Sequence, residues 1–398
     1  MSSFGTGVHN RPVVIVCVDS QNLGVKLTRR TKILGVVLGV LATAVLVLAA
    51  VLGHDSACEA PGPLPQEARL MKAIVYRCYG PPEVLALENT VRPAPADDEV
   101  LVRVRAAAVN PLDWHFMRGQ PYFMRLMSGI GKPKDERFGV DFAGTVEAVG
   151  RNVTRFRPGD DVLGGASGAL AEYLTVREDR ALVLKPGNIT FEEAAAVPVA
   201  AITALQALRD KGKLKPGQRV LVNGASGGVG TFAVQIARLL GAEVTGVCST
   251  RNVDLVRSIG ADHVVDYTQE DFTEGARRYD VIVDNVGNHP LLALRRVLNP
   301  DGIVVMVGGS SGDNWIGPLL GPIWAAMLSP FVSQTFAGLL ARLKQDDLRV
   351  LAEMLEAGSV QAVIDRRYPL AEVPAAIAYL EEGRARGKVV ISVETAAP

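Results

Sequence analysis

Residues 221–230 read LVNGASGGVG, and four of the seven residues from Gly224 to Gly230 are glycine. The stretch begins in the apolar run 220–222, which predicts a buried strand. After it, apolar residues recur at helical spacing as far as Leu240, and Gly241 follows where a helix would end. A glycine turn between a strand and a helix is the context in which such a turn holds a dinucleotide pyrophosphate. We therefore expect a phosphate site at the N-terminus of this helix.

The glycines follow the spacing G-x-x-G-x-x-G, and each has its own expected role. Gly224 allows a tight turn, Gly227 lets the backbone approach a pyrophosphate, and Gly230 lets the helix pack closely on the strand. A P-loop is excluded, because no Lys-Ser or Lys-Thr pair follows the glycines. A plain strand-to-helix turn that binds nothing is the alternative.

Beyond this turn, apolar strands alternate with helical segments. This alternation is typical of a parallel sheet covered by helices on both faces, with a ligand across the carboxyl ends of the strands. The expected strands are 218–222, 243–248, 264–267, 281–284 and 303–308.

The composition limits the function in two ways. Lysine plus arginine and aspartate plus glutamate each number 42 among 398 residues, so no basic excess favours a nucleic-acid partner. The four cysteines, at positions 17, 58, 78 and 248, show no C-x-x-C spacing. We interpret them as isolated thiols rather than as a disulfide framework.

Residues 33–52 carry no charge and are long enough to cross a bilayer as a helix of about 30 Å. We interpret them as a single N-terminal membrane span; a secretory signal peptide is the rival, although no good A-x-A site follows. A proline-rich linker follows at 58–65. Four basic residues between Lys26 and Lys32 place the body outside the cytoplasm, whereas the supply of reduced dinucleotide favours a cytoplasmic body. The side of the membrane therefore stays open.

Residues 71–203 contain short alternating strands separated by turns such as 157–160. This texture predicts a barrel-like β domain beside the dinucleotide domain. Thr190 and Glu193 make a capping box that predicts a short helix between the two. Residues 388–393 form a further buried strand, whose place the pattern alone does not fix.

The glycine turn VNGASGGVG (222–230), the strand-rich first half and the closing GKVVISV (387–393) resemble the medium-chain dehydrogenase/reductase superfamily. Within it, AAAVNPLDW (106–114) and GVDFAGTVEAVG (139–150) resemble the zinc-independent quinone oxidoreductase branch, which includes the ζ-crystallin-like proteins. The resemblance runs from about Met71 to the C-terminus. It implies that the closing strand returns to the β domain.

These features together predict an α/β fold: a Rossmann-type doubly wound parallel sheet, a GroES-like β-barrel domain and an N-terminal transmembrane helix. A homodimer is compatible with this arrangement. The expected parts are an N-terminal tail (1–32), a transmembrane helix (33–52), a linker (53–70), a GroES-like catalytic domain (71–195, completed by 365–398) and a Rossmann cofactor-binding domain (196–364).

The residues argue against a metal. Zinc enzymes of the superfamily carry a cysteine near positions 110–113 and a His-Glu pair where this chain has Val140 and Asp141, and Zn²⁺ needs such thiolate and imidazole ligands. The cluster of four cysteines that holds a structural zinc is also missing. His115, beside Trp114, is better explained as a packed or surface histidine. We expect no metal site.

Without a metal, the resemblance implies reduction of a quinone or of the C=C bond of a conjugated carbonyl compound. Hydride passes from the nicotinamide ring, and hydrogen-bond donors stabilise the developing oxyanion or enolate. By resemblance, Asn110 and Thr203 are expected near the nicotinamide, and Tyr122 is a candidate proton donor although its spacing departs from the family pattern. The alternatives are a loop-capping amide for Asn110 and a helix cap for Thr203.

We expect NADPH rather than NADH. The strand 243–248 runs out through Ser249, Thr250 and Arg251, where an NAD site normally places a carboxylate. Ser249 and Arg251 can donate to a 2′-phosphate, and Tyr267 resembles a family position that does the same; a solvated Arg251 is the alternative. The expected cofactor contacts are Gly224, Ser226, Gly227, Gly228, Val229, Gly230, Ser249, Arg251, Tyr267, Val286 and Gly308.

Two other functions stay open: an alcohol or aldehyde oxidoreductase on the same scaffold, and a non-catalytic NADPH-binding sensor. A short-chain reductase is excluded, because none of the eight tyrosines has a lysine four residues later. Residues 315–341 carry no charge, and three prolines argue against a spanning helix there. We expect this segment to be a lid or subunit interface, or else a surface that dips into the bilayer and admits a lipophilic acceptor.

Overall fold

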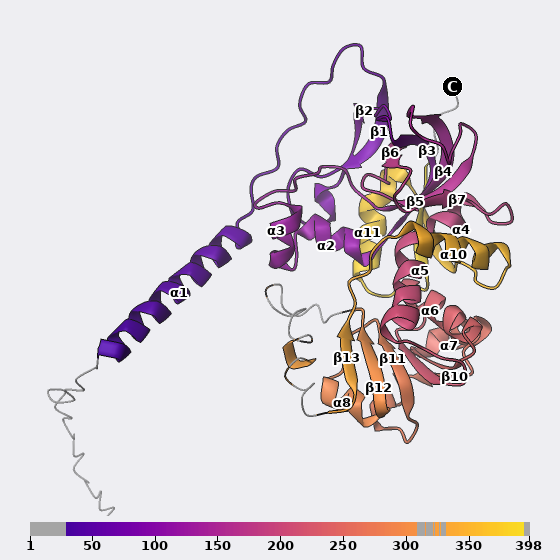
Figure 1. Ribbon diagram of the computed structural model, residues 1–398. Coiled ribbons are helices and arrows are strands. Elements are labelled where there is room, and N and C mark those ends of the chain that lie inside the picture. The colour runs from indigo at the N-terminus through magenta and orange to yellow at the C-terminus, as the bar shows by residue number, and fades with distance from the viewer. Residues whose placement is uncertain are drawn as a thin grey trace, which may run out of the picture. The chain divides into compact units, whose positions relative to one another are not determined.

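The computed structural model describes residues 29–308, 315, 321, 323–325, 327 and 332–393 (Figure 1). The chain divides into two units, residues 1–50 and 51–398, which are considered separately. Residues 1–28 of the predicted tail and much of the apolar segment 315–341 lie outside the described residues.

Six strands form the sheet that was expected around the glycine turn. Their order is β10-β9-β8-β11-β12-β13, and every neighbouring pair is parallel. This is the doubly wound order, with the strand that leads into the glycine turn in the middle, and it confirms the Rossmann-type sheet. The strands are β8 (Arg219–Asn223), β9 (Glu243–Cys248), β10 (His263–Asp266), β11 (Tyr279–Asp284), β12 (Leu298–Met306) and β13 (Thr335–Gly338).

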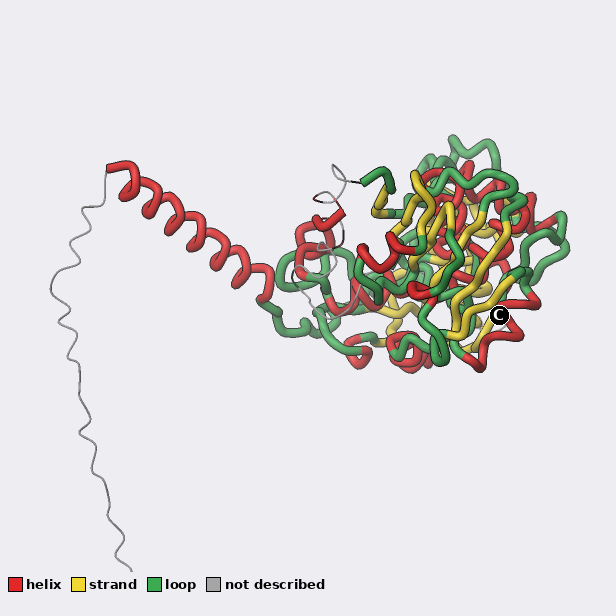
Figure 2. The backbone as a smooth tube through the Cα atoms, turned by 90° about the horizontal axis from the view of Figure 1, so that it is seen from below, coloured by secondary structure: helices red, strands yellow, loops and turns green. Residues whose placement is uncertain are grey.

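Helices cover this sheet on both faces. Alternate residues of its strands therefore point into two separate hydrophobic cores. On β8, Val220 and Val222 pack with Phe232 of the following helix, whereas Leu221 packs with Leu294 on the opposite face. Burial on both faces explains why residues 220–222 of β8 are all apolar. Figure 2 shows the strands in yellow and the helices around them in red. The helical elements are α5 (Pro198–Leu205), the π-helical turn η3 (Gln206–Lys211), α6 (Gly228–Leu239), η4 (Thr250–Asn252), α7 (Val253–Ser258), η5 (Phe272–Glu274), α8 (Leu291–Arg296) and α10 (Gln345–Glu356).

The other half contains a seven-stranded sheet whose members come from two distant parts of the chain. Its order is β14-β15-β3-β4-β5-β7, and β6 pairs with β3 off this path. β15 pairs antiparallel with β3, so the closing strand returns to the β domain as expected. The strands are β3 (Glu99–Val109), β4 (Asp141–Val149), β5 (Asp161–Gly165), β6 (Tyr173–Arg177), β7 (Leu182–Leu184), β14 (Ile364–Pro369) and β15 (Lys388–Ser392); β1 (Leu70–Val75) and β2 (Ala86–Val91) form a separate pair.

Alternation along β3 fixes which side of this sheet faces its core. Val100, Val102 and Val104 are fully buried, whereas Arg103 is half-buried and Arg105 exposed. Thr190 caps helix α4 (Phe191–Ala195) as predicted, since its Oγ1 accepts a hydrogen bond from the N–H of Glu193. The remaining helices are η1 (Pro82–Val84), α2 (Pro111–Arg118), η2 (Tyr122–Met124), α3 (Arg125–Ser128), α4 (Phe191–Ala195), η7 (Leu370–Glu372) and α11 (Val373–Glu381).

The predicted apolar span is helical. Helix α1 (Arg29–Gly53) begins before the expected span and ends just after it. Among the described residues, Gly35–Gly53 is one helical segment long and apolar enough to cross a membrane, with a mean hydropathy of 2.8. A signal sequence meets the same criteria, so the helix alone does not separate the two interpretations.

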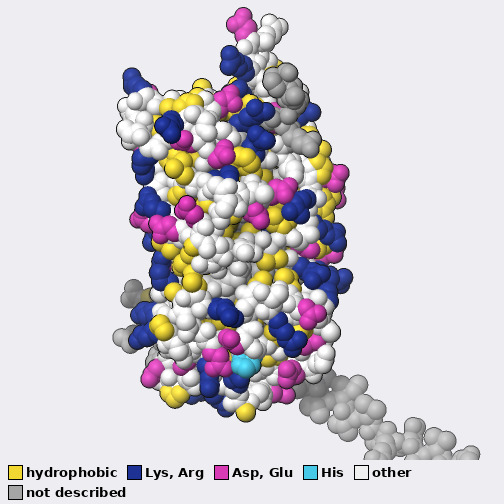
Figure 3. Space-filling model, turned by 90° about the vertical axis from the view of Figure 1, so that its right-hand side faces the viewer, with side chains coloured by type: hydrophobic (Ala, Val, Ile, Leu, Met, Phe, Trp, Pro, Cys, Tyr) yellow, Lys and Arg dark blue, Asp and Glu magenta, His cyan; other side chains and the backbone are white. Residues whose placement is uncertain are grey.

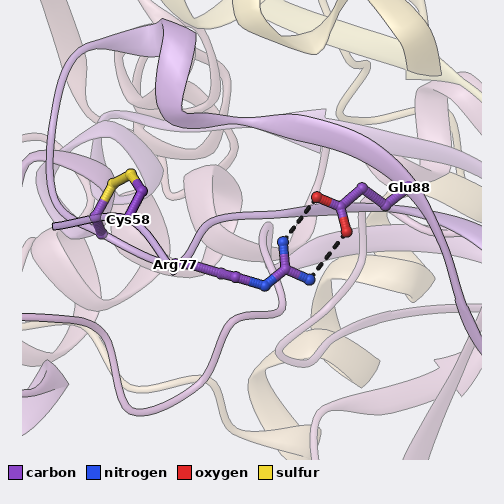
Figure 4. The surroundings of a disulfide bond; sticks show 4 residues. Cys58, Arg77 and Glu88 are labelled. Carbon is purple, nitrogen blue, oxygen red and sulfur yellow. Dashed lines mark hydrogen bonds and ion pairs between the residues drawn. A yellow bond between two sulfur atoms is a disulfide. The ribbon is translucent and has the colours of Figure 1, made fainter. Parts of the chain in front are cut away.

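Cys58 and Cys78 form a disulfide, so the interpretation of these two as isolated thiols was wrong (Figure 4). Their Cα atoms are 4.8 Å apart, within the range that a disulfide spans. No local pattern indicates this pair, because the two cysteines are 20 residues apart, with β1 between them, and meet only in the tertiary structure. Cys248 is free and buried, and burial raises the pKa of its thiol to about 11.

We expect Cys58→Ser to lower the free energy of unfolding of the full-length chain in detergent by roughly 3 kcal/mol. The reason is that the disulfide closes a loop of about 20 residues in the unfolded chain. Peptide mapping without reductant, after blocking thiols at cell lysis, should recover the Cys58 and Cys78 peptides linked. Separately alkylated peptides would contradict the disulfide. Since disulfides persist in oxidising compartments, a linked pair would indicate that residues 58–78 fold in such a compartment.

Candidate cofactor-binding and active site

The glycine turn lies at the carboxyl end of β8, in the middle of the parallel sheet. Gly224 has φ +76°, a conformation that glycine adopts without strain. A Cβ on Gly230 would lie 2.1 Å from the carbonyl oxygen of Gly224, so only glycine lets α6 approach the strand this closely. Packing and backbone conformation therefore account for these two glycines without any ligand.

Gly227, by contrast, is required by neither packing nor backbone conformation. It precedes α6 with φ −83° and ψ 177°, which any residue adopts. A Cβ there would meet nothing closer than the Gly224 carbonyl oxygen at 3.5 Å. Gly227 immediately precedes the first turn of the twelve-residue helix α6. The N–H groups of that first turn have no intrahelical acceptor. A pyrophosphate fits this arrangement, since it needs close backbone approach and free N–H donors.

A second part of the candidate site is formed where β11 and β12 end. A Cβ on Gly308 would lie 2.1 Å from the Asn285 carbonyl oxygen, and one on Gly224 would lie 2.9 Å from Val286. The structure thus brings Gly224, Val286 and Gly308 together. Asn285, which the sequence did not single out, donates from Nδ2 to the Asn223 carbonyl oxygen at 2.9 Å. Among the described residues its Oδ1 is buried without a partner, so it can accept a hydrogen bond from a ligand.

Asn252, which the sequence also did not indicate, bonds to two of the expected cofactor residues, Ser226 and Ser249. Its Nδ2 donates to the Oγ of Ser226 at 2.9 Å and to the Oγ of Ser249 at 3.3 Å. This amide joins the glycine turn to the end of β9. Arg251 is exposed and donates one N–H to the Arg384 carbonyl oxygen at 2.7 Å, while Tyr267 is 60% exposed.

A carboxylate does lie beside the end of β9, contributed by the neighbouring strand. Asp266 pairs in register with Cys248, the last residue of β9. Its oxygens accept hydrogen bonds from Thr250, Thr268 and Gln269. These bonds, that of Thr250 first, lower its pKa. The sequence does not indicate this neighbour, because Asp266 belongs to β10 and meets the end of β9 only through strand pairing.

A buried polar cluster lies where the closing strand β15 meets Asn110, the residue that follows β3. Lys388 on β15 is 3% exposed, and its Nζ donates to the Oδ1 of Asn110 and lies 3.2 Å from an oxygen of Asp141. The Nδ2 of Asn110 donates to the same Asp141 oxygen at 2.9 Å. A Cβ on Gly228 would lie 3.1 Å from the Cδ of Lys388, so the lysine also borders the glycine turn.

A second carboxyl group makes the charge of this cluster depend on pH. Asp113 accepts a hydrogen bond from the N–H of Asn110 at 2.7 Å and is fully enclosed. Burial, aided by the charge of Asp141, raises the pKa of Asp113 to about 7. Burial also raises the pKa of Asp141, against the opposing charge of Lys388. With Asp113 protonated, Asp141 and Lys388 balance each other.

The three expected catalytic residues do not all meet. Thr203 lies inside α5 and donates to the Val199 carbonyl oxygen at 2.6 Å, so it is not a helix cap. The N–H of Val199 donates to Asp141, which links Thr203 to the cluster around Asn110. Tyr122 instead stacks on Arg125 and on Trp315, with ring centres 4.4 Å apart in the latter pair. Its contacts are therefore made away from Asn110.

His115 on α2 contacts a backbone carbonyl group just after the end of that helix. Its Nδ1 lies 2.8 Å from the Gln120 carbonyl oxygen and its ring stacks on Trp114. Burial lowers the pKa of this imidazole. In the part of the chain that the structure describes, no group of three or more His, Cys, Asp or Glu side chains could hold a metal ion.

A doubly wound sheet with this glycine turn, joined to a β domain that the C-terminal strand completes, defines a nicotinamide-dependent oxidoreductase. Residues 96–187 match the family described as alcohol dehydrogenase GroES-like domain, and residues 259–391 the family described as zinc-binding dehydrogenase. The chain belongs to the medium-chain dehydrogenase/reductase family.

Named relatives span almost the whole folded body. A chloroplast envelope quinone oxidoreductase homolog of Arabidopsis thaliana is 33% identical over 81% of this chain and 98% of its own. An NADPH-dependent alkenal/one oxidoreductase of the same plant is 34% identical over 81% and 79%. The solved quinone oxidoreductase of Coxiella burnetii superposes with a TM-score of 0.72 at 28% identity, over 82% of this chain and all of that one. These similarities agree with the branch that the sequence motifs indicated.

Proposed function

We propose that the protein is a metal-free, NADPH-dependent reductase of quinones or of the C=C bond of conjugated carbonyl compounds. The observation that carries the proposal is the space above Gly227, which no requirement of the fold explains. Relatives named as quinone and alkenal/one oxidoreductases support the acceptor class. An alcohol or aldehyde oxidoreductase is the second candidate, favoured by the family descriptions that match.

The Lys388 ammonium supports the absence of a metal. Asn110 and Asp141 occupy the two segments where zinc enzymes of the superfamily carry ligands. The Lys388 ammonium donates a hydrogen bond to Asn110 and forms an ion pair with Asp141. A divalent cation beside this buried ammonium would be strongly repelled, and the site offers neither thiolate nor imidazole. The lysine thus supplies the positive charge that balances Asp141.

When bound, the cofactor supplies the hydride, and the residues of the chain position it. Gly227 to Gly230 and the first turn of α6 would hold the pyrophosphate, and Asn285 Oδ1 would accept a hydrogen bond from a ribose or carboxamide group. Asn110 is 2% exposed, and both polar ends of its side chain are engaged by Asp141 and Lys388. We therefore assign Asn110 to positioning the loop that faces the nicotinamide.

For the 2′-phosphate we propose Ser249, Arg251 and Tyr267. Arg251 has five N–H donors, of which one bonds to the Arg384 carbonyl oxygen within the described part of the chain, so the others can meet a phosphate. Asp266 is the group that opposes an anion here, but Thr250, Thr268 and Gln269 engage its oxygens. The attraction of the Arg251 guanidinium for the phosphate then exceeds the repulsion from Asp266, whose oxygens are already hydrogen-bonded.

We expect the full-length protein in detergent to bind NADPH about tenfold or more tightly than NADH, the low end of one charge-assisted hydrogen bond. Arg251→Ala should remove most of this preference and leave the dissociation constant of NADH almost unchanged. Arg257→Ala, an exposed arginine on the neighbouring helix α7, is the matched control and should keep the preference. Equal affinities in the wild type, or loss of both cofactors in Arg251→Ala, would contradict the assignment.

We further propose that α1 anchors the protein in a membrane. Its length and mean hydropathy support this, and the Arabidopsis relative is named as a protein of the chloroplast envelope. A cleaved signal sequence is the alternative. A lipophilic acceptor such as a quinone would be dissolved in the same membrane.

A further inference from the structure

The chain that leaves α1 is held firmly to the folded body by a buried arginine. Arg125 on α3 is 1% exposed, and its guanidinium donates to the carbonyl oxygens of Leu52 at 2.9 Å and His54 at 3.0 Å. It also pairs with Asp55 at 2.8 Å. Leu52 lies in the last turn of α1, where the carbonyl groups lack intrahelical partners. The arginine therefore satisfies the Leu52 carbonyl, and its positive charge interacts favourably with the negative end of the helix dipole.

Further contacts extend this attachment along the predicted linker. The N–H of Ser56 donates to the Gly131 carbonyl oxygen at 2.9 Å, Glu59 pairs with Lys132 and Cys58 is bonded to Cys78. Residues 52–59 are therefore part of the body rather than a free tether. We call the segment 119–132, to which most of these contacts are made, the docking segment.

The outer side of the docking segment is apolar and exposed. Phe123, Leu126, Met127 and Ile130 are 36%, 56%, 78% and 53% exposed. Phe123, Leu126 and Met127 are three and four residues apart along the η2–α3 helical turns and so share one face, while Arg125 is buried; Ile130 follows two residues after α3 ends. Lys132 and Lys134 are exposed beside them, and Trp315, 41% exposed, stacks on Tyr122. Apolar, aromatic and lysine side chains in this combination are typical of a membrane–water interface.

We propose that this face, formed by Phe123, Leu126, Met127 and Ile130, rests in the headgroup region of the bilayer that holds α1. We infer that lipid covers this face, because the end of the apolar helix is bonded to the segment that carries the face. Leu52, in the last turn of that helix, is hydrogen-bonded to Arg125, which lies between Phe123 and Leu126 in the sequence. The span must leave the bilayer within a few residues of Leu52, so the docking segment lies at the membrane surface. The inference rests on the proposed anchor and goes beyond it, because it fixes which surface of the body meets the lipid.

Tryptophan quenching in vesicles tests this placement. Full-length Met127→Trp is reconstituted into phosphatidylcholine vesicles with or without bromine on the upper acyl chain, and the wild-type emission of the three native tryptophans is subtracted. We expect the added emission to fall by roughly half in brominated vesicles, since interfacial side chains reach the acyl boundary. Leu184→Trp on β7, 55% exposed, is the matched control and should lose almost none.

Extraction at alkaline pH separates the possible failures. A protein that stays with the vesicles but shows equally weak quenching in both variants overturns the docking face and leaves the anchor standing. If the protein solubilised from these vesicles then has twice the mass of one chain, the face is covered by a second copy of the chain. A protein that alkali releases overturns both the anchor and the face. NADPH oxidation, measured on the same vesicles, reports on the proposed activity independently of either result.

Discussion

Lys388→Met is expected to lower the free energy of unfolding by about 3–5 kcal/mol, because it leaves Asp141 buried without its counter-ion. Lys388 and Asp141 are 3% and 0% exposed and 3.2 Å apart, so water cannot replace the missing partner. Methionine keeps the length of the side chain, which limits the loss of packing. Chemical denaturation of the full-length protein in detergent measures the effect.

A double-mutant cycle separates the ion pair from the loss of packing. Asp141→Asn removes the charge but keeps an amide that can meet Asn110, and combining it with Lys388→Met should recover part of the stability. A cost below about 1 kcal/mol for Lys388→Met, or simple additivity of the two changes, would contradict a buried charge pair at this place.

Gly227→Ala is expected to weaken NADPH binding at least tenfold while leaving the fold intact. The added methyl group has room in the protein, where its nearest neighbour is the Gly224 carbonyl oxygen at 3.5 Å, but it occupies the space through which a pyrophosphate reaches α6. A charge-assisted hydrogen bond is worth about 1.5–3 kcal/mol, so losing one suffices for this effect. Alanine at a helix N-cap should itself cost below about 1.5 kcal/mol of stability. Titration of cofactor fluorescence gives the affinity.

Gly230→Ala is the matched control for this substitution. Its methyl group would lie 2.1 Å from the Gly224 carbonyl oxygen, so it should destabilise the fold by about 1–3 kcal/mol. Wild-type affinity in a folded Gly227→Ala protein would show that no phosphate approaches the turn there.

Periodicity predicted most of the fold, because the strands of a parallel sheet are apolar throughout and helices start and stop at recognisable residues. The boundaries of β9, the helix after the glycine turn and the cap at Thr190 agree with the sequence interpretation, and β8 begins and ends one residue later than expected. The return of β15 to the β domain came from the family resemblance alone, since no local pattern specifies a partner for a buried strand.

The residues that the sequence did not indicate are those whose partners are distant. Lys388 is 278 residues from Asn110, and Arg125 is 73 residues from Leu52. A single lysine in a strand or arginine at the start of a short helix carries no signal of burial until its acceptors are known. The Cys58–Cys78 disulfide and the position of Asp266 beside Cys248 were missed for the same reason.

Turnover by a sample of known metal content tests the central claim most directly. Full-length protein in detergent, with zinc determined by elemental analysis, is mixed with NADPH and a quinone or a conjugated enone, and cofactor oxidation is followed by absorbance. We predict turnover with zinc far below one per chain and no loss on addition of a chelator. Tight NADPH binding without turnover would instead indicate a sensor, and stoichiometric zinc with chelator-sensitive turnover would contradict a metal-free reductase.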